Sequence, residues 1–552
     1  MTTTRRPGWF EGEAAVQRLL ERQLGPAFEK AKPRLQRMGE RAANEGAAWA
    51  HTADHEGPRL VTHDRAGTRV DDIEYHPSYR ALQALGYGGG IIAATYDPTL
   101  SQERGQAPRA LTFGLGYLFA QAEAGLFCPI CMTDGAARLL AKFGTPSLRE
   151  RFVPRLASTN LERLYTGAMF LTEKAGGSDV GQVSTVAKGG AGVPGEAVTL
   201  HGDKWFCSNV DADVIMILAR PEGAGPGTKG LGLYVLPRTL DDGRRNRFRI
   251  ERLKDKLGER SFPTGEVTLD GAQAYLLGGP GQGFHQMAEM LNLSRLYNAI
   301  ASVAVMRRSV TEALEWAEQR VAFGRRIIEH PLLTETLLDL ASEQRVALAW
   351  AFRGVELLDR LDGGTASDVE RRTLRVLTPL LKYVLGKWAV RLASEGLEVL
   401  AGNGYIEDWP MARVLRDAQV LPIWEGTTNI LVLDAFRALR KEGAHEVLFA
   451  ELERLAAEAP ADVQGRLAAL VEELKQALAE LSDDARAEHA FRDFTDRAAV
   501  LWAVAVTCAK STGAGTEADV RAGRRVLSRH VPAGLLRRDR ATVDDVRAVA
   551  FR

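Results

Sequence analysis

The sequence predicts a mainly helical chain with a small β domain in its middle and a helical extension at its C-terminus. Two changes of residue pattern carry this prediction. Apolar residues recur at helical spacing before about residue 165 and after about residue 283, whereas short β-like runs and glycine-rich turns fill the stretch between. At 552 residues, the chain is also too long for one ordinary hydrophobic core.

The first predicted domain is an N-terminal helical domain at residues 1–165, rich in Ala, Leu, Arg and Glu. It contains Cys128 and Cys131, whose spacing is that of a redox pair or half of a metal site. No second CxxC and no nearby pair of histidines completes such a site, and the flanking residues have the pattern of a buried helix. We therefore interpret both cysteines as structural thiols and expect no metal.

Three further domains are predicted along the chain. Residues 166–278 form a middle β domain, because runs such as AVTLHGDKWF and VIMILA have β character. Residues 279–440 form a helical bundle, and residues 445–552 form an extra helical domain that begins after a break at KEGAH. Shared helical faces support both helical domains, and they consist of Leu374, Leu377, Leu381, Leu385 and Leu392 in one case and Val463, Leu467, Leu470 and Leu474 in the other.

The composition gives no global signal for a nucleic-acid or membrane partner. The formal net charge is zero, so no global charge steers the chain toward nucleic acid or anionic lipid. The N-terminus lacks the apolar stretch of a secretory signal, and no run approaches the ~20 apolar residues of a membrane span. Four scattered cysteines agree with a reducing compartment. We therefore expect a cytoplasmic protein with no membrane partner.

Arginines gather locally near the C-terminus. Arg521, Arg524, Arg525 and Arg529 are spaced to share one helical face, and Arg537, Arg538 and Arg540 follow them. Such a group forms either a phosphate-binding patch or a solvated helix face. Both interpretations stay open at this point, because the carboxylates of the same region nearly balance the charge.

Five short segments have residues suited to binding chemistry. In Phe170–Gly181, paired glycines and Ser178 let backbone amides and a hydroxyl approach a flat polar ligand, and Thr172 can bond a ring edge. Gly202–Asn209 adds an aromatic face and the hydroxyl of Ser208. The other three segments lie in the predicted bundle, at Arg320–Ile327, Leu400–Pro410 and Arg416–Ile430.

In this order and at these separations, the five segments resemble the acyl-CoA dehydrogenase family, from roughly Glu123 to Leu439. The resemblance implies the three-part fold of that family, with an N-terminal helical domain, a middle β-barrel-like domain and a C-terminal four-helix bundle. It also implies a homotetramer and an FAD cofactor between the β domain and the bundle.

The resemblance assigns FAD-binding roles residue by residue. Positions near the flavin ring are Leu171, Thr172, Gly177, Ser178, Phe206 and Ser208. Positions that reach the cofactor of a neighbouring subunit are Arg320 and Phe323, where an arginine fork suits pyrophosphate oxygens. Positions near the adenosine, phosphate and ribose are Gly402, Gly404, Thr427 and Asn429. Glu398 stands where many relatives have Gln, which puts the contact to the partner's adenine in doubt.

Glu425, in WEGTTN, matches the catalytic base of the family. Removing a proton alpha to a thioester requires a carboxylate at hydrogen-bond reach in a dry pocket, while hydride passes to the flavin. Some relatives carry the acid on an earlier helix, but this chain has Ser294 at that position, which leaves Glu425 as the candidate. Arg295 matches a residue near the CoA end of the substrate, and a salt bridge within the bundle is the alternative.

Within the family, the chain is most similar to the AidB-type adaptive-response flavoproteins. The similarity rests on Gln121–Thr133, Glu74–Leu82, Lys174 and the long tail. Members of that group bind FAD and double-stranded DNA and have weak dehydrogenase activity, so two hypotheses follow. One is an oxidoreductase for a short or branched acyl-CoA that passes electrons to an electron-transfer flavoprotein or another acceptor. The other is a DNA-binding flavoprotein whose candidate contacts are Arg437, Arg521 and Arg525.

Overall fold

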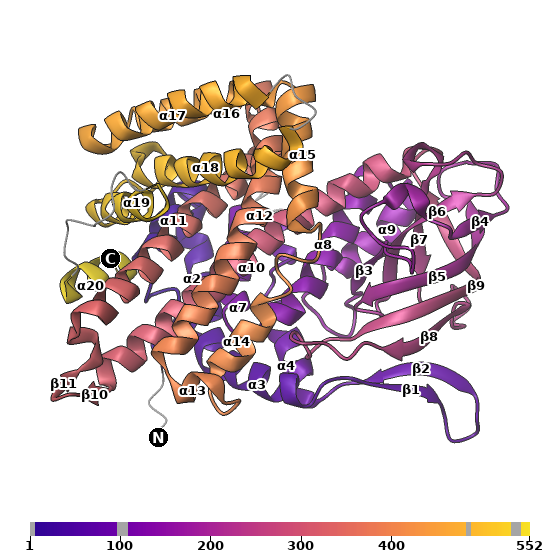
Figure 1. The fold of residues 1–552 in the computed structure, drawn as a ribbon. Helices are drawn as coiled ribbons and strands as arrows, with labels where there is room; N and C mark the ends of the chain where they lie inside the picture. Colours follow the sequence, from indigo (N-terminus) through magenta and orange to yellow (C-terminus); the bar gives the residue numbers. More distant parts are fainter. Residues whose placement is uncertain (1–5, 97–108, 482–486, 532–541, 552) are drawn as a thin grey trace. The chain divides into compact units, whose positions relative to one another are not determined.

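The computed structural model describes residues 6–96, 109–481, 487–531 and 542–551 (Figure 1). The chain forms two compact units that alternate along the sequence. The helical unit consists of Met1–Asn44, Asp97–Ala122 and Asn298–Arg552, and the β unit consists of Glu45–Tyr96 and Glu123–Tyr297. The predicted fold class, mainly helical with a middle β domain, is confirmed.

The β unit is built on a seven-stranded sheet. Its strands are β3 (Gly167–Phe170), β4 (Val186–Lys188), β5 (Ala197–Ser208), β6 (Val214–Pro221), β7 (Gly232–Pro237), β8 (Phe248–Leu253) and β9 (Thr264–Leu277). Neighbours pair in the order β6, β4, β5, β9 and β7, and β7 pairs back onto β6, which closes this part of the sheet into a small barrel. Closure removes exposed strand edges. β3 is parallel to β6, and β8 is antiparallel to β9.

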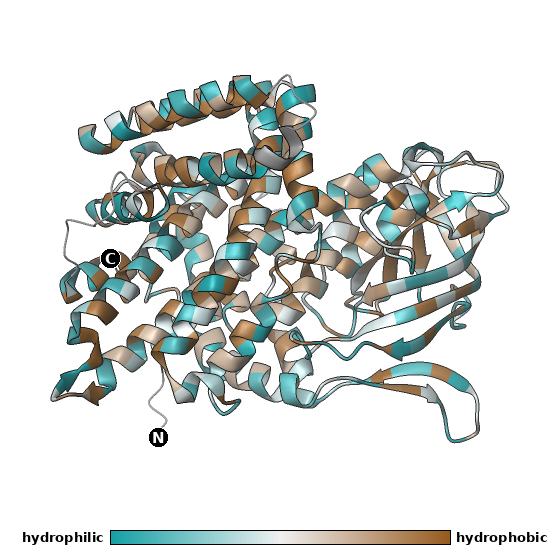
Figure 2. Ribbon diagram, viewed as in Figure 1, coloured by the Kyte–Doolittle hydropathy of each residue, from teal (hydrophilic) through white to brown (hydrophobic). Residues whose placement is uncertain are grey.

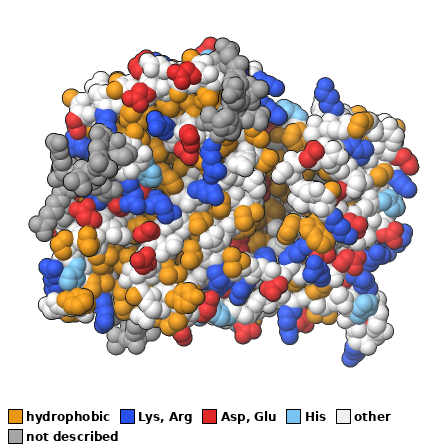
Figure 3. Space-filling model, viewed as in Figure 1, with side chains coloured by type: hydrophobic (Ala, Val, Ile, Leu, Met, Phe, Trp, Pro, Cys, Tyr) orange, Lys and Arg blue, Asp and Glu red, His pale blue; other side chains and the backbone are white. Residues whose placement is uncertain are grey.

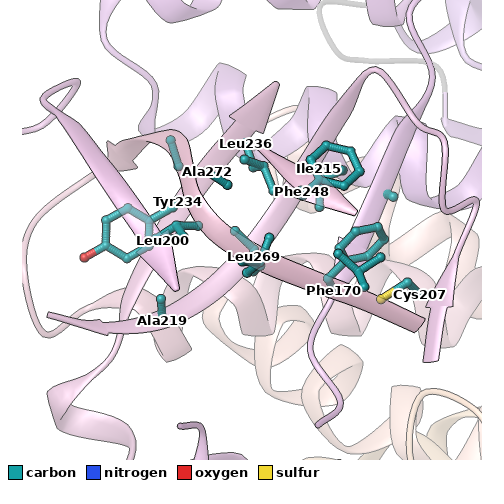
Figure 4. Packing of buried hydrophobic residues seen from close by; sticks show 14 of the residues in the cluster. Phe170, Leu200, Cys207, Ile215, Ala219, Tyr234, Leu236, Phe248, Leu269 and Ala272 are labelled. Atoms are coloured by element: carbon teal, nitrogen blue, oxygen red, sulfur yellow. The ribbon is translucent and has the colours of Figure 1, made fainter. Parts of the chain in front are cut away.

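Both faces of β6 are buried, which explains its continuous apolar run VIMILA. Ile215, Ile217 and Ala219 belong to the cluster inside the barrel, where Figure 4 shows Ile215 and Ala219 among side chains from other strands. The alternate residues Met216 and Leu218 belong to a second cluster, which includes residues of the neighbouring helices. Successive side chains of a strand point to opposite faces, so a strand with apolar residues at every position can pack into both clusters.

The remaining elements of the β unit are helices and one hairpin. They are α3 (Ala47–His55), β1 (Arg59–His63), β2 (Arg69–Glu74), α4 (Pro77–Gly86), α5 (Ala93–Tyr96), α8 (Ala124–Phe143) and α9 (Pro146–Leu156). Helix α8 carries Cys128 and Cys131, which do not form a disulfide, and Cys131 donates to Ser294 Oγ at 3.3 Å. By length and composition α8 is apolar enough to cross a membrane, but its most apolar stretch is 89% buried, as expected for a core helix.

The helical unit contains the long bundle helices and the C-terminal helices. It begins with α1 (Ala14–Leu24), α2 (Phe28–Arg41) and α7 (Arg109–Ala120), and α10 (Gly283–Gln319) enters it at Asn298. Then follow β10 (Val321–Ala322), β11 (Arg325–Arg326), α11 (Pro331–Asp362), α12 (Asp368–Val399), α13 (Gly402–Tyr405), α14 (Pro410–Ala418) and α15 (Thr428–Lys441). The last helices are α16 (Ala444–Ala456), α17 (Ala461–Leu481), α18 (Ala487–Cys508), α19 (Glu517–His530) and α20 (Val543–Phe551).

Helix α11 packs against several other helices of this unit. It contacts α12, and it also contacts α18, α19 and α20 of the C-terminal region. Trp350 of α11 and Trp502 of α18 are both fully buried, with ring centroids 6.5 Å apart. Residues 298–440 of the predicted bundle and residues 445–552 therefore belong to one compact unit, whereas residues 279–297 belong to the β unit. Alternating polar and apolar residues along α16 and α17 are visible in Figure 2.

Of the predicted arginine face on α19, Arg525 and Arg529 are turned toward α11. Arg525 Nε lies 2.6 Å from Asp339 Oδ1, and its side chain is only 9% exposed. Arg529 pairs with Asp339 and Glu343, and Arg521 pairs with Asp545 of α20. The proposed DNA contact at Arg525 is thereby corrected, because its charge is engaged by carboxylates inside the protein. Three more arginines of the predicted group lie outside the described residues, namely Arg537, Arg538 and Arg540.

A buried ion pair fixes the loop that follows β3. Lys204 of β5 is 1% exposed, and its ammonium donates to Glu173 Oε1 at 2.7 Å. The backbone N–H and hydroxyl groups of Ser184 and Thr185 also donate to the two Glu173 oxygens. Burial raises the pKa of Glu173, but the Lys204 ammonium and these hydroxyl groups outweigh burial and lower the pKa to about 2.

We expect Arg525→Met to lower the free energy of unfolding by about 2 to 3 kcal/mol. This is less than for a fully buried pair, because Glu335, the second partner of Arg525, is partly exposed. The matched control is Arg524→Met on the same helix, whose pair with Asp462 is about half exposed. The control should cost less than about 1 kcal/mol in urea denaturation followed by tryptophan fluorescence. Equal effects of the two variants would contradict the inward orientation of Arg525.

Glu173 should make the β unit acid-labile. Its pKa of about 2 lies below the ordinary value of 4.5, so its ionised form stabilises the fold above pH 4.5. That contribution, on the order of 3 kcal/mol, is lost as the pH falls from 4.5 to about 2. Unfolding midpoints of wild type and Glu173→Gln should therefore differ at pH 7 and converge near pH 2. A constant difference across this range would show that Glu173 is not the titrating group.

Candidate functional site

In the β unit, the predicted flavin-loop residues follow β3. Trp205 N–H donates to the carbonyl of Thr172 at 2.9 Å, which ties this loop to β5. A Cβ on Gly177 would lie 2.5 Å from Thr172 Oγ1, so only glycine fits there. Leu171 and Thr172 are half-buried, whereas Ser178 is exposed. The loop therefore presents backbone and hydroxyl groups at the surface of this unit.

An aromatic and basic surface lies next to that loop. Phe206, on β5, is 55% exposed, which is unusual for a large apolar side chain on a sheet. Lys254 Nζ lies 3.3 Å from the centroid of the Trp205 ring and 4.8 Å from that of Phe206. Ser208 is half-buried beyond them, with its hydroxyl 3.4 Å from that of Thr264. An exposed ring flanked by hydroxyls suits a flat ligand that stacks and bonds at its edge.

On the first part of α10, the structure separates two neighbouring candidates. Ser294 is 2% exposed and accepts from Cys131, so it forms part of the packed interior. Arg295 is half-buried, and its guanidinium donates to Asn292 Oδ1 at 3.2 Å on the same helix. Neither position carries a carboxylate.

In the helical unit, Glu425 lies on a tight turn between α14 and α15. Its φ is +57°, in the left-handed region that non-glycine residues rarely adopt, and Gly426 follows with a φ of +107°. Ile423 and Trp424 both donate their N–H groups to the Val420 carbonyl, which winds the chain just before Glu425. Such strained backbone persists only where the surroundings hold it, and it concentrates at functional sites.

Three helix residues hold this turn. Asn298 Nδ2 of α10 donates to the Leu421 carbonyl at 3.1 Å. At Gly386 of α12, an added Cβ would lie 3.2 Å from the same Leu421 carbonyl oxygen, so α12 contacts the backbone of the turn closely. Lys382, one turn earlier on α12, donates from Nζ to the Gly426 carbonyl at 2.6 Å. None of the three was singled out from the sequence, because helical spacing does not show which loop a helix contacts.

The turn continues directly into the N-terminus of α15. Thr427 is the N-cap residue, and its side chain makes no capping hydrogen bond. Thr427 and Asn429 are both exposed. Unsatisfied N–H groups of the first turn, together with these side chains, provide donors for an anionic ligand.

Gly402 and Gly404 form α13, just after α12. A Cβ on Gly404 would lie 2.1 Å from the Leu397 carbonyl oxygen, so glycine is required there. Ala401 before them has a φ of +51°. Glu398 is exposed on the last turn of α12. These residues form a sharp turn that exposes backbone groups.

Arg320 directly precedes the β10–β11 hairpin, and Phe323 lies between its two strands. Phe323 is at the tip, with a φ of +52° and a side chain that is 96% exposed. Its ring meets that of His330 edge to face at 6.0 Å. One chain therefore presents this aromatic ring to its surroundings rather than to its own candidate base.

Charges outside these sites are mixed. Arg437 is exposed on α15, whereas Arg521 and Arg525 are paired as described above. On the face drawn in Figure 3, Lys and Arg side chains alternate with acidic and apolar ones. Among the residues that the structure describes, no group of three or more His, Cys, Asp and Glu side chains is arranged to hold a metal ion.

Comparisons with known proteins agree with this arrangement. Residues 4–163 match the adaptive response protein AidB N-terminal domain, residues 168–272 the acyl-CoA dehydrogenase middle domain, and residues 281–439 the acyl-CoA dehydrogenase C-terminal domain. Acyl-CoA dehydrogenase family member 11 of Caenorhabditis elegans is 36% identical over 80% of this chain and 72% of its own length. The putative acyl-CoA dehydrogenase AidB of Escherichia coli is 34% identical over 71% of each chain.

Solved structures give the same result. The Bd2924 apo-form structure matches with a TM-score of 0.84 and 36% sequence identity, over 92% of this chain and 98% of that chain. Caenorhabditis elegans ACDH-11 in complex with C11-CoA matches with a TM-score of 0.88 and 31% sequence identity. The match covers 97% of this chain and 94% of that chain. With family matches over most of its length and relatives above 30% identity, the chain belongs to the acyl-CoA dehydrogenase family and is similar to its AidB group.

Proposed function

We propose that this protein is an FAD-dependent acyl-CoA dehydrogenase that desaturates a short or branched acyl-CoA thioester, with Glu425 as the base. The observation that carries the proposal is the turn at Glu425. A carboxylate on strained backbone, held by residues of two helices and followed by a helix N-terminus, is positioned for a specific task.

Glu425 would remove the proton alpha to the thioester carbonyl. The chain's part in this step is to present an ionised carboxylate at hydrogen-bond distance from that proton. Its backbone N–H is placed on the same turn, where it can donate to the thioester oxygen and stabilise the charge that develops there. FAD, when bound, supplies the acceptor for the hydride that leaves the beta carbon.

The residues fit FAD on chemical grounds. The β unit offers the exposed Phe206 ring, the Ser208 hydroxyl and the backbone around Gly177, which suit a flat heterocycle with polar edges. The helical unit offers the α15 N-terminus and Thr427, which suit phosphate. Membership of the acyl-CoA dehydrogenase family supports the same cofactor.

Acyl-CoA is the proposed substrate class. ACDH-11, which is 31% identical to this chain, was solved with C11-CoA, so the panel tested should extend from short and branched acyl groups to that length. Electrons would leave through an electron-transfer flavoprotein or another acceptor. The exposed hairpin with Arg320 and Phe323 supports assembly into a homotetramer in which each hairpin reaches a neighbouring subunit.

Duplex DNA binding through residues 445–552 has less support. The described arginines of α19 are engaged by carboxylates, and affinity for DNA depends on cations that can neutralise phosphates. Arg437 is an exposed candidate contact that this argument does not remove.

Glu425→Gln should bind thioester but fail to reduce the flavin. Anaerobic mixing of the purified protein with each acyl-CoA should bleach the visible flavin band of the wild type. The Gln variant should react about 10²- to 10⁴-fold more slowly, because it cannot accept the proton. Glu453→Gln, an exposed glutamate of α16, is the control. A yellow wild-type protein that no thioester reduces would reject the dehydrogenase assignment, and salt-dependent binding of duplex DNA would be measured next.

Phe323→Ala should release FAD without unfolding the chain. Because the side chain is 96% exposed, its removal should change the unfolding midpoint little, whereas a contact with a neighbour's cofactor would be lost. The measurement is the flavin-to-protein ratio after gel filtration, with Val369→Ala, 56% exposed on α12, as the control. Undiminished FAD content in Phe323→Ala would argue against this contact.

A further inference from the structure

Lys382 is a charged residue at an unexpected depth. It lies on α12 among buried apolar residues, and it is 0% exposed. Removing a lysine from water is costly unless hydrogen bonds and opposite charge compensate. A surface lysine with its long stem buried would keep its ammonium in water, and Lys382 does not. Its position therefore calls for a specific interaction at the ammonium.

That interaction is with the turn that carries Glu425. The ammonium donates to the Gly426 carbonyl at 2.6 Å, a short distance typical of a charge-assisted bond. Gly426 directly follows the candidate base and has a φ of +107°. A bond to this carbonyl holds the peptide plane next to Glu425 and so restrains the strained turn.

The electrostatic surroundings of the Lys382 ammonium destabilise its positive charge unless an anion lies near. Gly426 precedes Thr427, the N-cap of α15, and the N-terminus of a helix carries partial positive charge. A cation at this end of a helix is unfavourable, whereas a carboxylate is favourable. Glu425 is the carboxylate next to Gly426 in the chain.

On each of the larger helices packed against α12, a charged group has an ion-pair or hydrogen-bond partner of its own. These pairs are Glu343 of α11 with Arg391, Arg413 with Asp417 on α14, Asp434 of α15 with Arg375, Glu446 of α16 with Arg372, and Asp496 of α18 with Tyr383.

We infer that Lys382 is a positioning residue for the candidate base: it holds the Gly426 carbonyl, fixes the turn that presents Glu425, and favours the ionised carboxylate. This inference rests on the proposed dehydrogenase function for its chemical meaning. The geometry of the restraint stands on the hydrogen bond alone.

The first test measures the turn itself. Lys382→Met keeps the length and apolar stem but removes the ammonium, and Lys387→Met makes the same change at an exposed position five residues later on α12. Hydrogen exchange followed by mass spectrometry should show faster exchange in the peptide spanning residues 421–431 for Lys382→Met alone. Unchanged exchange in that peptide would overturn the restraint.

The second test separates charge from structure. An opposite charge nearby shifts a carboxylate by about one pH unit or more, so the acid limb of flavin reduction should move to higher pH by about that amount in Lys382→Met. Activity should fall about tenfold near the acid limb and recover at higher pH, while binding of a non-reactive acyl-CoA thioether stays within a few-fold. Lys382→Arg should keep the acid limb of the wild type, and Lys387→Met should not change it.

Two results would count against the inference in different ways. A loss of activity by the same factor at every pH, together with weak thioether binding, would show a purely structural role and overturn the electrostatic part. If wild-type protein reduces no flavin with any thioester, the proposed function fails instead. The hydrogen-exchange result still decides whether Lys382 restrains the turn.

Discussion

Lys204, Lys382 and Glu343 lie almost wholly inside this protein, at 1%, 0% and 0% exposed, and each depends on hydrogen bonds that replace water. Burial of a charge without such partners costs several kcal/mol. The partners must therefore stay in place wherever the fold persists. Each buried charge, which we call a fixed point, therefore restrains the segments that form hydrogen bonds with it.

The three fixed points hold different segments. Lys204 and Glu173 hold the loop that follows β3, including the backbone next to Thr172. Lys382 holds the turn that carries Glu425. Glu343, bonded to His530 and paired with Arg529, attaches α19 to α11. These buried charges thus connect the candidate site residues and the C-terminal helices to neighbouring helices and strands. Such supporting contacts hold the side chains of a site in a defined position.

The sequence predicted what depends on local pattern and missed what depends on packing. The small barrel followed from β-like runs such as VIMILA, because strand periodicity is visible in one segment. Glu425 followed from its motif. Lys382 did not, because a lysine inside an apolar helical stripe is equally compatible with a side chain that reaches water. The α19 arginines show the same limit, since spacing showed that Arg525 lies on a face of the helix but not that α11 covers this face.

The turn at Glu425 meets two opposing requirements of the proposed base. A base for an alpha proton works best where water is excluded, but desolvation favours its neutral form, which cannot accept a proton. A nearby cation and a helix N-terminus both favour the ionised form, and each is present beside this turn. The left-handed backbone at Glu425 turns the chain sharply, so that the carboxylate residue, the Gly426 carbonyl held by Lys382 and the start of α15 follow one another within a few residues.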